Sequence, residues 1–579
     1  MSGKGIYLFM WGYQGSYRIH TQILVRNVLE SLGAPEDAEV LLVGARSPDS
    51  NSHNPVCIEP EDGKWKLSLF EGLLDSIESN YQNHDMQNVF YGDEASMRDK
   101  PEWIRRDSVR KAVEKSLKAY DSQNDVASFC GEVRRLNGYY VTPIIQIPNT
   151  TFQKFPPLPF IKQELKRNGH RSLIHAAMHA VLHEATEELH NPDPGRNTFH
   201  STRNAEEIVR IAAKNFMHTP GLAIEQGDMF SDLFTSLNLV SSLMYEGTKG
   251  IGQLILVDPD NDAVEFLVRF DEPIPFREPR WVRKVLQMAT SGVGIIANSQ
   301  HIYGLGQLKE SHDSSAQDAF TIAFIDHYHW ELRCGEQALL RSHYAEPKLP
   351  QEPFDKIAFL ANYARLFPLS TRKDGMHLWD LMLIQVRQDY GSMIVVAEDA
   401  KNEAQRLSKQ GTRIKPTRLT GQLLRSVSCI DGTILLDPAG YCYAIGIILD
   451  GEANEQCAPS RGSRYNSGVR YVQSNGPKRL AIVVSDDKTV DIIPRFRKLV
   501  SRSKIEKYIS TFEAATLDNY HDSRNWLDNH RFYINSEQCA RINRTIDHIN
   551  ALPKEVGVIH ICTEQFEAHP EMNESYLTD

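Results

Sequence analysis

Apolar residues along this chain recur with spacings that alternate between strand-like and helix-like. In the first part, three apolar runs predict a strand, a helix and a strand: Ile6–Trp11, Thr21–Leu32 and Glu39–Val43. The polar stretches 46–63 and 86–106 predict loops. Because strands that alternate with helices are typical of α/β folds, we expect residues 1–165 to form an N-terminal α/β domain.

The second part, residues 170–345, begins with helical spacing over 170–218 and then returns to short apolar runs. These runs predict two strands, a helix and a further strand: Gln253–Val257, Ala263–Phe270, Pro279–Ala289 and Gly294–Ala297. A polar turn at Asp258–Asp262 separates the first two strands. We therefore expect a domain that is helical first and α/β afterwards.

A proline-containing segment, 345–353, predicts a linker before the third part. Two helices are expected next, Asp355–Leu366 and Leu378–Asp389. We assign residues 353–498 to this third α/β domain. The basic start of residues 499–579, with an expected helix at Glu537–Leu552 and strand at Val556–Cys562, predicts a C-terminal α/β extension.

The composition is that of a large folded protein with an acidic surface. The chain has 579 residues, 41% of them hydrophobic, and a formal net charge of −11. That charge gives no general attraction for nucleic acid or anionic membranes. The eight cysteines form no Cys-x-x-Cys pair, which is typical of reduced intracellular proteins, and no window of about eighteen apolar residues could span a bilayer. We therefore expect a cytoplasmic protein without a membrane partner and consider a nucleic-acid partner improbable.

Two segments of the third domain carry the residue types that bind a polyphosphate. Asp431-Gly432-Thr433 places a carboxylate on a tight turn between apolar runs. Gly462-Ser463-Arg464-Tyr465-Asn466-Ser467 packs a glycine, two hydroxyls, an arginine and an amide into one loop. Hard divalent cations prefer oxygen ligands, and arginine matches phosphate oxygens with a planar fork of donors. Alone, Asp431-Gly432 would predict only a turn, so the interpretation rests on both segments together.

In order and spacing these segments resemble the diadenylate cyclase domain family. Asp431-Gly432-Thr433 stands for that family's Asp-Gly-Ala motif, and Gly462 to Ser467 for its Gly-Thr-Arg-His-Arg motif. Val483-Val484-Ser485-Asp486-Asp487 stands for its Val-Val-Ser-Glu-Glu strand, and Gly391–Val396 for its first core strand. Tyr465-Asn466 replaces the family's His-Arg pair, and Thr433 replaces its alanine. The resemblance covers about a fifth of the chain.

The resemblance implies a mixed sheet with helices on both faces, and an enzyme that condenses two ATP into cyclic di-AMP and pyrophosphate. Asp431 would hold Mg²⁺ or Mn²⁺ and, with Arg464, would be catalytic. The expected nucleotide-binding residues are Gly432, Thr433, Gly462, Ser463, Arg464, Tyr465, Asn466, Ser467 and Ser485. Two such domains would face each other, so a homodimer or larger even assembly is expected. Sensor domains commonly precede this core in the family, and residues 170–345 are the candidate.

Other functions stay open at this point. A core that lacks the His-Arg pair could bind a nucleotide as a sensor without turnover, or it could cyclise a nucleotide other than ATP. An interaction scaffold without any nucleotide is a further alternative. Separately, His175, His179 and His183 recur at helical spacing, which fits either a metal site or, more commonly, one polar face of a helix.

Overall fold

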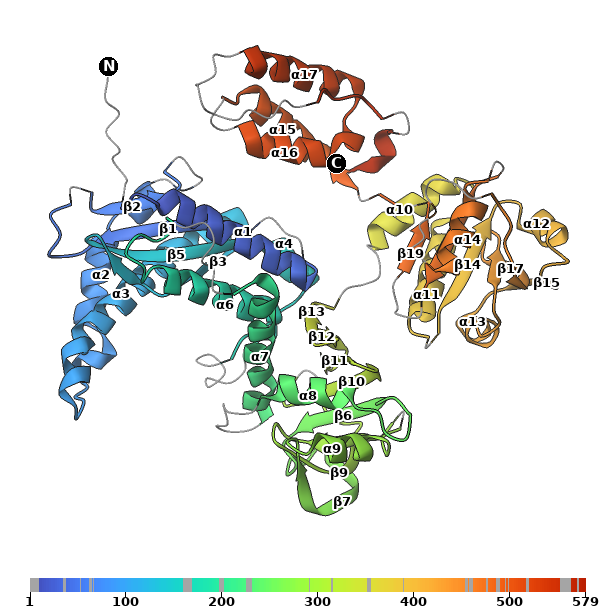
Figure 1. Ribbon diagram of the computed structural model, residues 1–579, viewed down its shortest axis with the longest axis horizontal. Coiled ribbons are helices and arrows are strands. Elements are labelled where there is room, and N and C mark those ends of the chain that lie inside the picture. Colours follow the sequence, from blue (N-terminus) through green and yellow to red (C-terminus); the bar gives the residue numbers. More distant parts are fainter. Residues whose placement is uncertain are drawn as a thin grey trace. The chain divides into compact units, whose positions relative to one another are not determined.

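The computed structural model is α/β throughout, and its chain divides into two compact units, Met1–Pro350 and Gln351–Asp579 (Figure 1). The finer division into four domains stays a prediction. The structure describes residues 10–34, 38–52, 54–61, 65, 67–159, 169–196, 203–224, 232–290, 292–313, 316–350, 356–388, 390–452, 457, 462–474, 477–485, 490–494, 496–497, 499–516, 520–551, 564–569 and 572–578.

The first sheet of the N-terminal unit has the strand order β2-β1-β5-β3, with β4 also paired to β5, and all its pairs are antiparallel. Its strands are β1 (Glu39–Arg46), β2 (Val56–Glu59), β3 (Val126–Cys130), β4 (Arg134–Leu136) and β5 (Tyr139–Pro148). The helices around it are α1 (Gln14–Leu32), α2 (Leu73–Gln82), α3 (Glu94–Asn124), α4 (Asn149–Lys154), α6 (Leu173–Glu188) and α7 (Ala205–Ile224), with short 3₁₀ helices at Leu67–Phe70 and Asp85–Asn88.

Helices cover both faces of this sheet because successive strand residues point to opposite faces. On β1, Val40 packs with α1, α6 and α7, whereas Leu41 and Val43 pack with α2 and α3. On β5, Ile145 packs in the same cluster as Val40, and Ile144 packs in the same cluster as Leu41 and Val43. A strand that is buried on both faces has a continuous run of apolar residues, which explains why β1 could be predicted from the sequence.

Two predictions for this region are wrong. The first half of α3 lies in the stretch 86–106 that we expected to be a loop, and β2 lies in 46–63. The helix α3 is mostly polar, and in the stretch up to residue 106 only Lys100 and Ile104 are buried, so apolar periodicity is weak there. A local signal does exist, since Asp93 caps the helix by accepting a hydrogen bond from the Ser96 amide at 2.7 Å. The strand expected at Ile6–Trp11 lies mostly outside the described residues.

The second sheet of this unit has eight strands in the order β13-β12-β11-β10-β6-β8-β9-β7, and only the β6–β8 pair is parallel. The strands are β6 (Gly252–Val257), β7 (Val264–Pro275), β8 (Gly294–Ala297), β9 (His301–Leu308), β10 (Ala319–Asp326), β11 (His329–Cys334), β12 (Gln337–His343) and β13 (Glu346–Lys348). Two helices accompany them, α8 (Leu233–Ser242) and α9 (Pro279–Leu286). The elements predicted between residues 253 and 297 are all present, although β7 runs five residues further than expected.

The C-terminal unit contains a mixed six-stranded sheet with the order β15-β17-β16-β14-β18-β19. Its strands are β14 (Ser392–Ala397), β15 (Thr412–Arg418), β16 (Thr433–Leu436), β17 (Tyr441–Ile447), β18 (Arg479–Val484) and β19 (Val490–Ile493). Its helices are α10 (Lys356–Leu366), α11 (Arg372–Val386), α12 (Ala400–Arg406), α13 (Gly421–Val427) and α14 (Ser463–Val472). Alternate residues of β14 again face different clusters: Ile394 packs with α10 and α11, and Val395 packs with α12 and α14. The predicted α/β class with helices on both faces is confirmed.

The last segment is helical where it is described. It contains α15 (Arg502–Glu513), α16 (Tyr520–Asn529) and α17 (Ser536–Ala551), the two-residue strands β20 (Val500–Ser501) and β21 (Leu577–Thr578), and 3₁₀ turns at Arg531–Tyr533 and Glu574–Tyr576. The predicted helix at Glu537–Leu552 is confirmed, and the predicted strand at Val556–Cys562 lies outside the described residues. Within the described part of the chain, no helix is both long and apolar enough to cross a bilayer.

Candidate functional site

The strand order of the C-terminal sheet brings three of the sequence motifs to one edge. Met393 at the start of β14 pairs with Thr433 at the start of the parallel strand β16. On its other side Met393 pairs with Val483, near the end of the antiparallel strand β18. The turn before β16 and Ser485 after β18 therefore lie at the same edge of the sheet.

Helix α14 adds the second motif to that edge. A Cβ placed on Gly468 would lie 3.4 Å from Cβ of Ala481, so the helix packs closely on the middle of β18. At the far end of the helix, the Arg479 guanidinium donates a hydrogen bond to the carbonyl of Tyr471 at 3.2 Å. The helix therefore runs antiparallel to β18, and its first residues, Ser463 onward, lie at the end of β18 where Ser485 follows.

Asp431 and Arg464 meet at this edge. Nη2 of Arg464 lies 3.9 Å from Oδ1 of Asp431, and the same oxygen accepts a hydrogen bond from the Gly432 amide at 3.0 Å. The Asp431 carboxylate is 99% exposed, whereas the Arg464 side chain is 36% exposed. A carboxylate and a guanidinium so close together and so open to solvent can each take a ligand, the carboxylate a cation and the guanidinium a phosphate.

The backbone holds Asp431 in a fixed turn. Gly432 has a φ of +114°, a conformation that L side chains rarely adopt, and a Cβ there would lie 2.6 Å from the carbonyl carbon of Gly446 on β17. Gly446 itself has a φ of +62°. Only glycine permits this close approach of two backbones, so Gly432 positions Asp431 and offers no side chain of its own.

The start of α14 supplies backbone donors. Gly462 is the N-cap, and among the described residues its helix start has no side-chain cap. The amide groups at a helix start, together with the helix dipole, favour an anion. The exposed Ser463 hydroxyl and the Arg464 guanidinium follow within the first turn, so this segment is chemically suited to phosphate.

The remaining predicted residues are placed less favourably. Thr433 is fully buried, and its Oγ1 has no hydrogen-bond partner among the described atoms. Tyr465 packs against the cluster beneath α14, and the Asn466 amide donates to the Gly462 carbonyl at 3.4 Å. Ser467 and Ser485 are half-buried. Of the predicted side chains, Asp431 and Ser463 are thus exposed, and Arg464 is partly exposed beside Asp431.

A divalent cation fits this edge only in company with phosphate. Among the residues that the structure describes, no group of three histidine, cysteine or acidic side chains could hold a metal ion. Mg²⁺ is commonly held by one or two carboxylates with substrate phosphates and water completing its shell. Asp431, exposed and next to a phosphate-compatible helix start, suits that arrangement.

The histidine stripe lies on α6, in the N-terminal unit. Nδ1 of His175 lies 2.8 Å from the hydroxyl of Ser172, and its ring is 5.3 Å from that of Phe129. His179 also contacts Phe129, whereas His183 is exposed. Burial lowers the pKa of His175 to about 3. The first two histidines therefore pack against the ring of Phe129.

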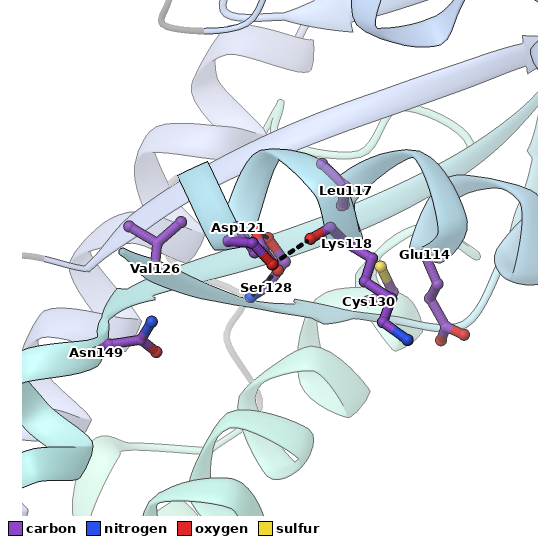
Figure 2. A pocket seen from close by; sticks show the side chains of 9 residues that line it. Glu114, Leu117, Lys118, Asp121, Val126, Ser128, Cys130 and Asn149 are labelled. Atoms are coloured by element: carbon purple, nitrogen blue, oxygen red, sulfur yellow. Dashed lines mark hydrogen bonds between the residues drawn. The ribbon is translucent and has the colours of Figure 1, made fainter. Parts of the chain in front are cut away.

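A polar cavity of about 330 Å³ between α3 and β3 was not expected from the sequence (Figure 2). Asp121 on α3 accepts hydrogen bonds there from the amide and the hydroxyl of Ser128 on β3, at 3.0 and 2.7 Å. Burial raises the pKa of Asp121 against the opposing effect of these bonds. Lys118 and Cys130 also line the cavity, as Figure 2 shows. These residues come from separate elements and share no local motif, so no sequence signal could have assembled them.

Comparison with protein families gives two matches, both in the N-terminal unit. Residues 10–217 match a family described as probable sensor domain DACNG, and residues 231–336 match one described as probable sensor domain DACNH. The cavity in Figure 2 falls inside the first match. No curated protein matches the chain.

Two solved structures are similar to part of this chain. A cysteine double mutant of DacA from Staphylococcus aureus is 15% identical, with a TM-score of 0.19, and the match covers 24% of this chain and 94% of that one. A hypothetical membrane spanning protein from Bacillus cereus is 18% identical, with a TM-score of 0.18, and the match covers 22% of this chain and 62% of that one.

Proposed function

We propose that the C-terminal unit is a nucleotidyltransferase that condenses two ATP into cyclic di-AMP and pyrophosphate, under control of N-terminal sensor domains. The observation that carries this proposal is the meeting of Asp431 and Arg464 beside the start of α14. Those groups come from two motifs that resemble the diadenylate cyclase family.

Each residue has a distinct part in the proposed reaction. Arg464, Ser463 and the first amides of α14 hold the phosphates of ATP, and Ser467 and Ser485 add hydroxyl contacts. Asp431 holds Mg²⁺ or Mn²⁺, and the bound ion supplies charge stabilisation at the α-phosphate. The 3′-hydroxyl of one ATP loses its proton and attacks the α-phosphorus of the second ATP, the bond to the β-phosphate oxygen breaks, and a first pyrophosphate leaves. The 3′-hydroxyl of the second nucleotide then attacks the remaining α-phosphorus in the same way, and loss of a second pyrophosphate closes the ring. The protein contributes mainly position and electrostatics.

The exposure of Asp431 supports a site that two copies complete. Because the Asp431 carboxylate is 99% exposed, the described residues of one copy do not shield it from water. Ring closure also needs two ATP molecules facing each other, one on each domain. We therefore propose that a homodimer or larger even assembly is the active form.

The two probable sensor domain matches support the regulatory half of the proposal. A sensor needs a ligand cavity, and the polar cavity between α3 and β3 offers both charges together with hydroxyl and amide groups. We propose that a small polar metabolite binds there and changes how the cyclase-like domains meet.

A second candidate function is nucleotide binding without turnover. Tyr465 and Asn466 stand where the resembled family has His-Arg, and both are engaged by the fold, in core packing and in a contact with Gly462. A core that has lost two functional side chains in this way could retain ATP as a signal. Altered contacts could also select another nucleotide.

Incubation of the purified full-length protein with ATP and Mn²⁺, followed by mass-resolved chromatography, tests the proposal. Asp431→Ala removes the carboxylate, and Asp380→Ala is the matched control, since Asp380 is an exposed carboxylate on α11. Cyclic di-AMP from the wild type and Asp380→Ala but not from Asp431→Ala is the expected result. Unchanged ATP together with ATP-dependent thermal stabilisation would favour the binding function. The same assay with GTP, or with ATP and GTP mixed, separates the nucleotide alternatives.

A further inference from the structure

The C-terminal helical segment contains a cavity of about 710 Å³ that is separate from the Asp431 edge. Its walls come from the end of α16 with the turn that follows and from six residues at and before the start of α15: Phe496, Arg497, Leu499, Val500, Ser501 and Lys504. Ligand sites for small molecules typically occupy about 300–1,000 Å³. The cavity therefore has room for a ligand the size of a nucleotide.

A stack of three aromatic rings borders this cavity through two of its members. The ring of Trp526 lies 4.1 Å from that of Tyr508 with an interplanar angle of 5°, and 3.8 Å from that of His530 with an angle of 12°. Trp526 and His530 line the cavity but Tyr508 does not. The cavity is thus bordered by the rings of Trp526 and His530 and by that of Tyr533, which lies 6.0 Å from the His530 ring, and a planar ligand ring can pack against these aromatic side chains.

Two cationic side chains line the same cavity. Lys504 and Arg497 are both exposed, and no carboxylate among the described residues lies within salt-bridge distance of either. The Arg497 guanidinium lies over the ring of Phe532 at 3.7 Å, and the Lys504 ammonium lies 5.8 Å from the centre of the Trp526 ring. In a chain with a net charge of −11, cations without a carboxylate partner beside stacked rings point to an anionic ligand.

We propose that this cavity binds a nucleotide at a second site, distinct from the Asp431 edge. The base packs against the aromatic side chains that line the cavity, Trp526 among them, and Lys504 and Arg497 hold the phosphate. The exposed amide of Asn529, which also lines the cavity, reaches the edge of the base. An acidic chain disfavours extended nucleic acid, so a mononucleotide or dinucleotide is the expected ligand. The site does not depend on whether the core is an active cyclase.

Photoaffinity labelling of the full-length protein with 8-azido-AMP tests the proposal, because peptide mapping by mass spectrometry separates the two sites. Labelled peptides from 520–533 are expected, and unmodified AMP should suppress that label. Label confined to the segment around α14 would overturn the second site while leaving the proposed core function intact. Label at 520–533 that AMP fails to suppress would also overturn it.

Variants of the cations sharpen the test. Arg497→Gln with Lys504→Gln should raise the AMP concentration for half-suppression at least about tenfold, because charge-assisted contacts to phosphate are lost. Lys507→Gln is the matched control, since Lys507 is exposed on the same helix but lies outside the cavity wall. An equal effect of both substitutions would refute the phosphate role. Stronger suppression by a single-stranded oligonucleotide than by AMP would replace the nucleotide with nucleic acid as the ligand.

Discussion

Replacing Gly432 by alanine tests whether the turn before β16 holds Asp431 through its backbone. The added Cβ would lie 2.6 Å from the carbonyl carbon and 2.8 Å from the carbonyl oxygen of Gly446. Real Cβ atoms do not come so close to backbone, so one of the two chains must move. The φ of +114° at this position is also unfavourable for any L side chain.

The two effects add to a substantial loss of local stability. A non-glycine residue in this region of backbone conformation costs about 1–3 kcal/mol. Forcing an extra carbon into a packed site typically costs about 1–3 kcal/mol more. We expect the free energy of opening the β16–β17 pairing to fall by about 3 kcal/mol. At about 1.4 kcal/mol for each factor of ten, the open state becomes about 100-fold more populated, and hydrogen exchange of its amides becomes about 100-fold faster.

Hydrogen exchange measured by mass spectrometry on the full-length protein reads this out locally, since amides of Thr433–Leu436 report on β16 alone. Gly462→Ala is the control: its φ is −64°, and nothing lies within 4 Å of the added Cβ. That substitution should cost less than about 1 kcal/mol, the usual range for an N-cap change. Equal exchange in Gly432→Ala and wild type, or equal acceleration by both substitutions, would refute the reasoning.

Three further predictions concern charged groups. Glu403→Gln should destabilise the C-terminal unit by about 3 kcal/mol in denaturant titration, because the buried Arg479 loses its nearer carboxylate, 3.2 Å away, and keeps only the longer contact of 3.9 Å with Asp399. Burial alone would raise the pKa of Glu403, but Arg406 and Arg479 lower it. The ionised Glu403 therefore stabilises the folded C-terminal unit above about pH 4.5, and this contribution is lost on acidification. Melting temperatures measured over a pH series check the sign. Arg464→Gln should raise the ATP concentration for half-maximal thermal stabilisation about tenfold, and an unchanged value would remove Arg464 from the phosphate site. Asp121→Asn should abolish the rise in melting temperature that a cavity-binding metabolite gives the N-terminal unit. Asp99→Asn, at an exposed position of the same helix, should leave that rise unchanged.

The strongly apolar elements could be predicted from the sequence because burial on both faces leaves a continuous apolar run. Strands β1, β6, β8 and β14 were each predicted within a few residues, as were helices α10 and α17. The long helix α3 was missed because an exposed helix shows little periodicity. The motif around Asp431 was also visible, since a carboxylate on an Asp-Gly turn is a local pattern.

By itself, the sequence determined the α/β class, the acidic character of the chain and the residue types at the nucleotide motifs. Only the tertiary structure decided that Asp431, Arg464 and the end of β18 share one edge, because strand order and the direction of α14 bring together segments far apart in the chain. It also decided that Thr433 is buried. Cavities such as those beside Asp121 and Lys504 depend on packing between separate elements, and packing at that distance leaves no periodic trace in the sequence.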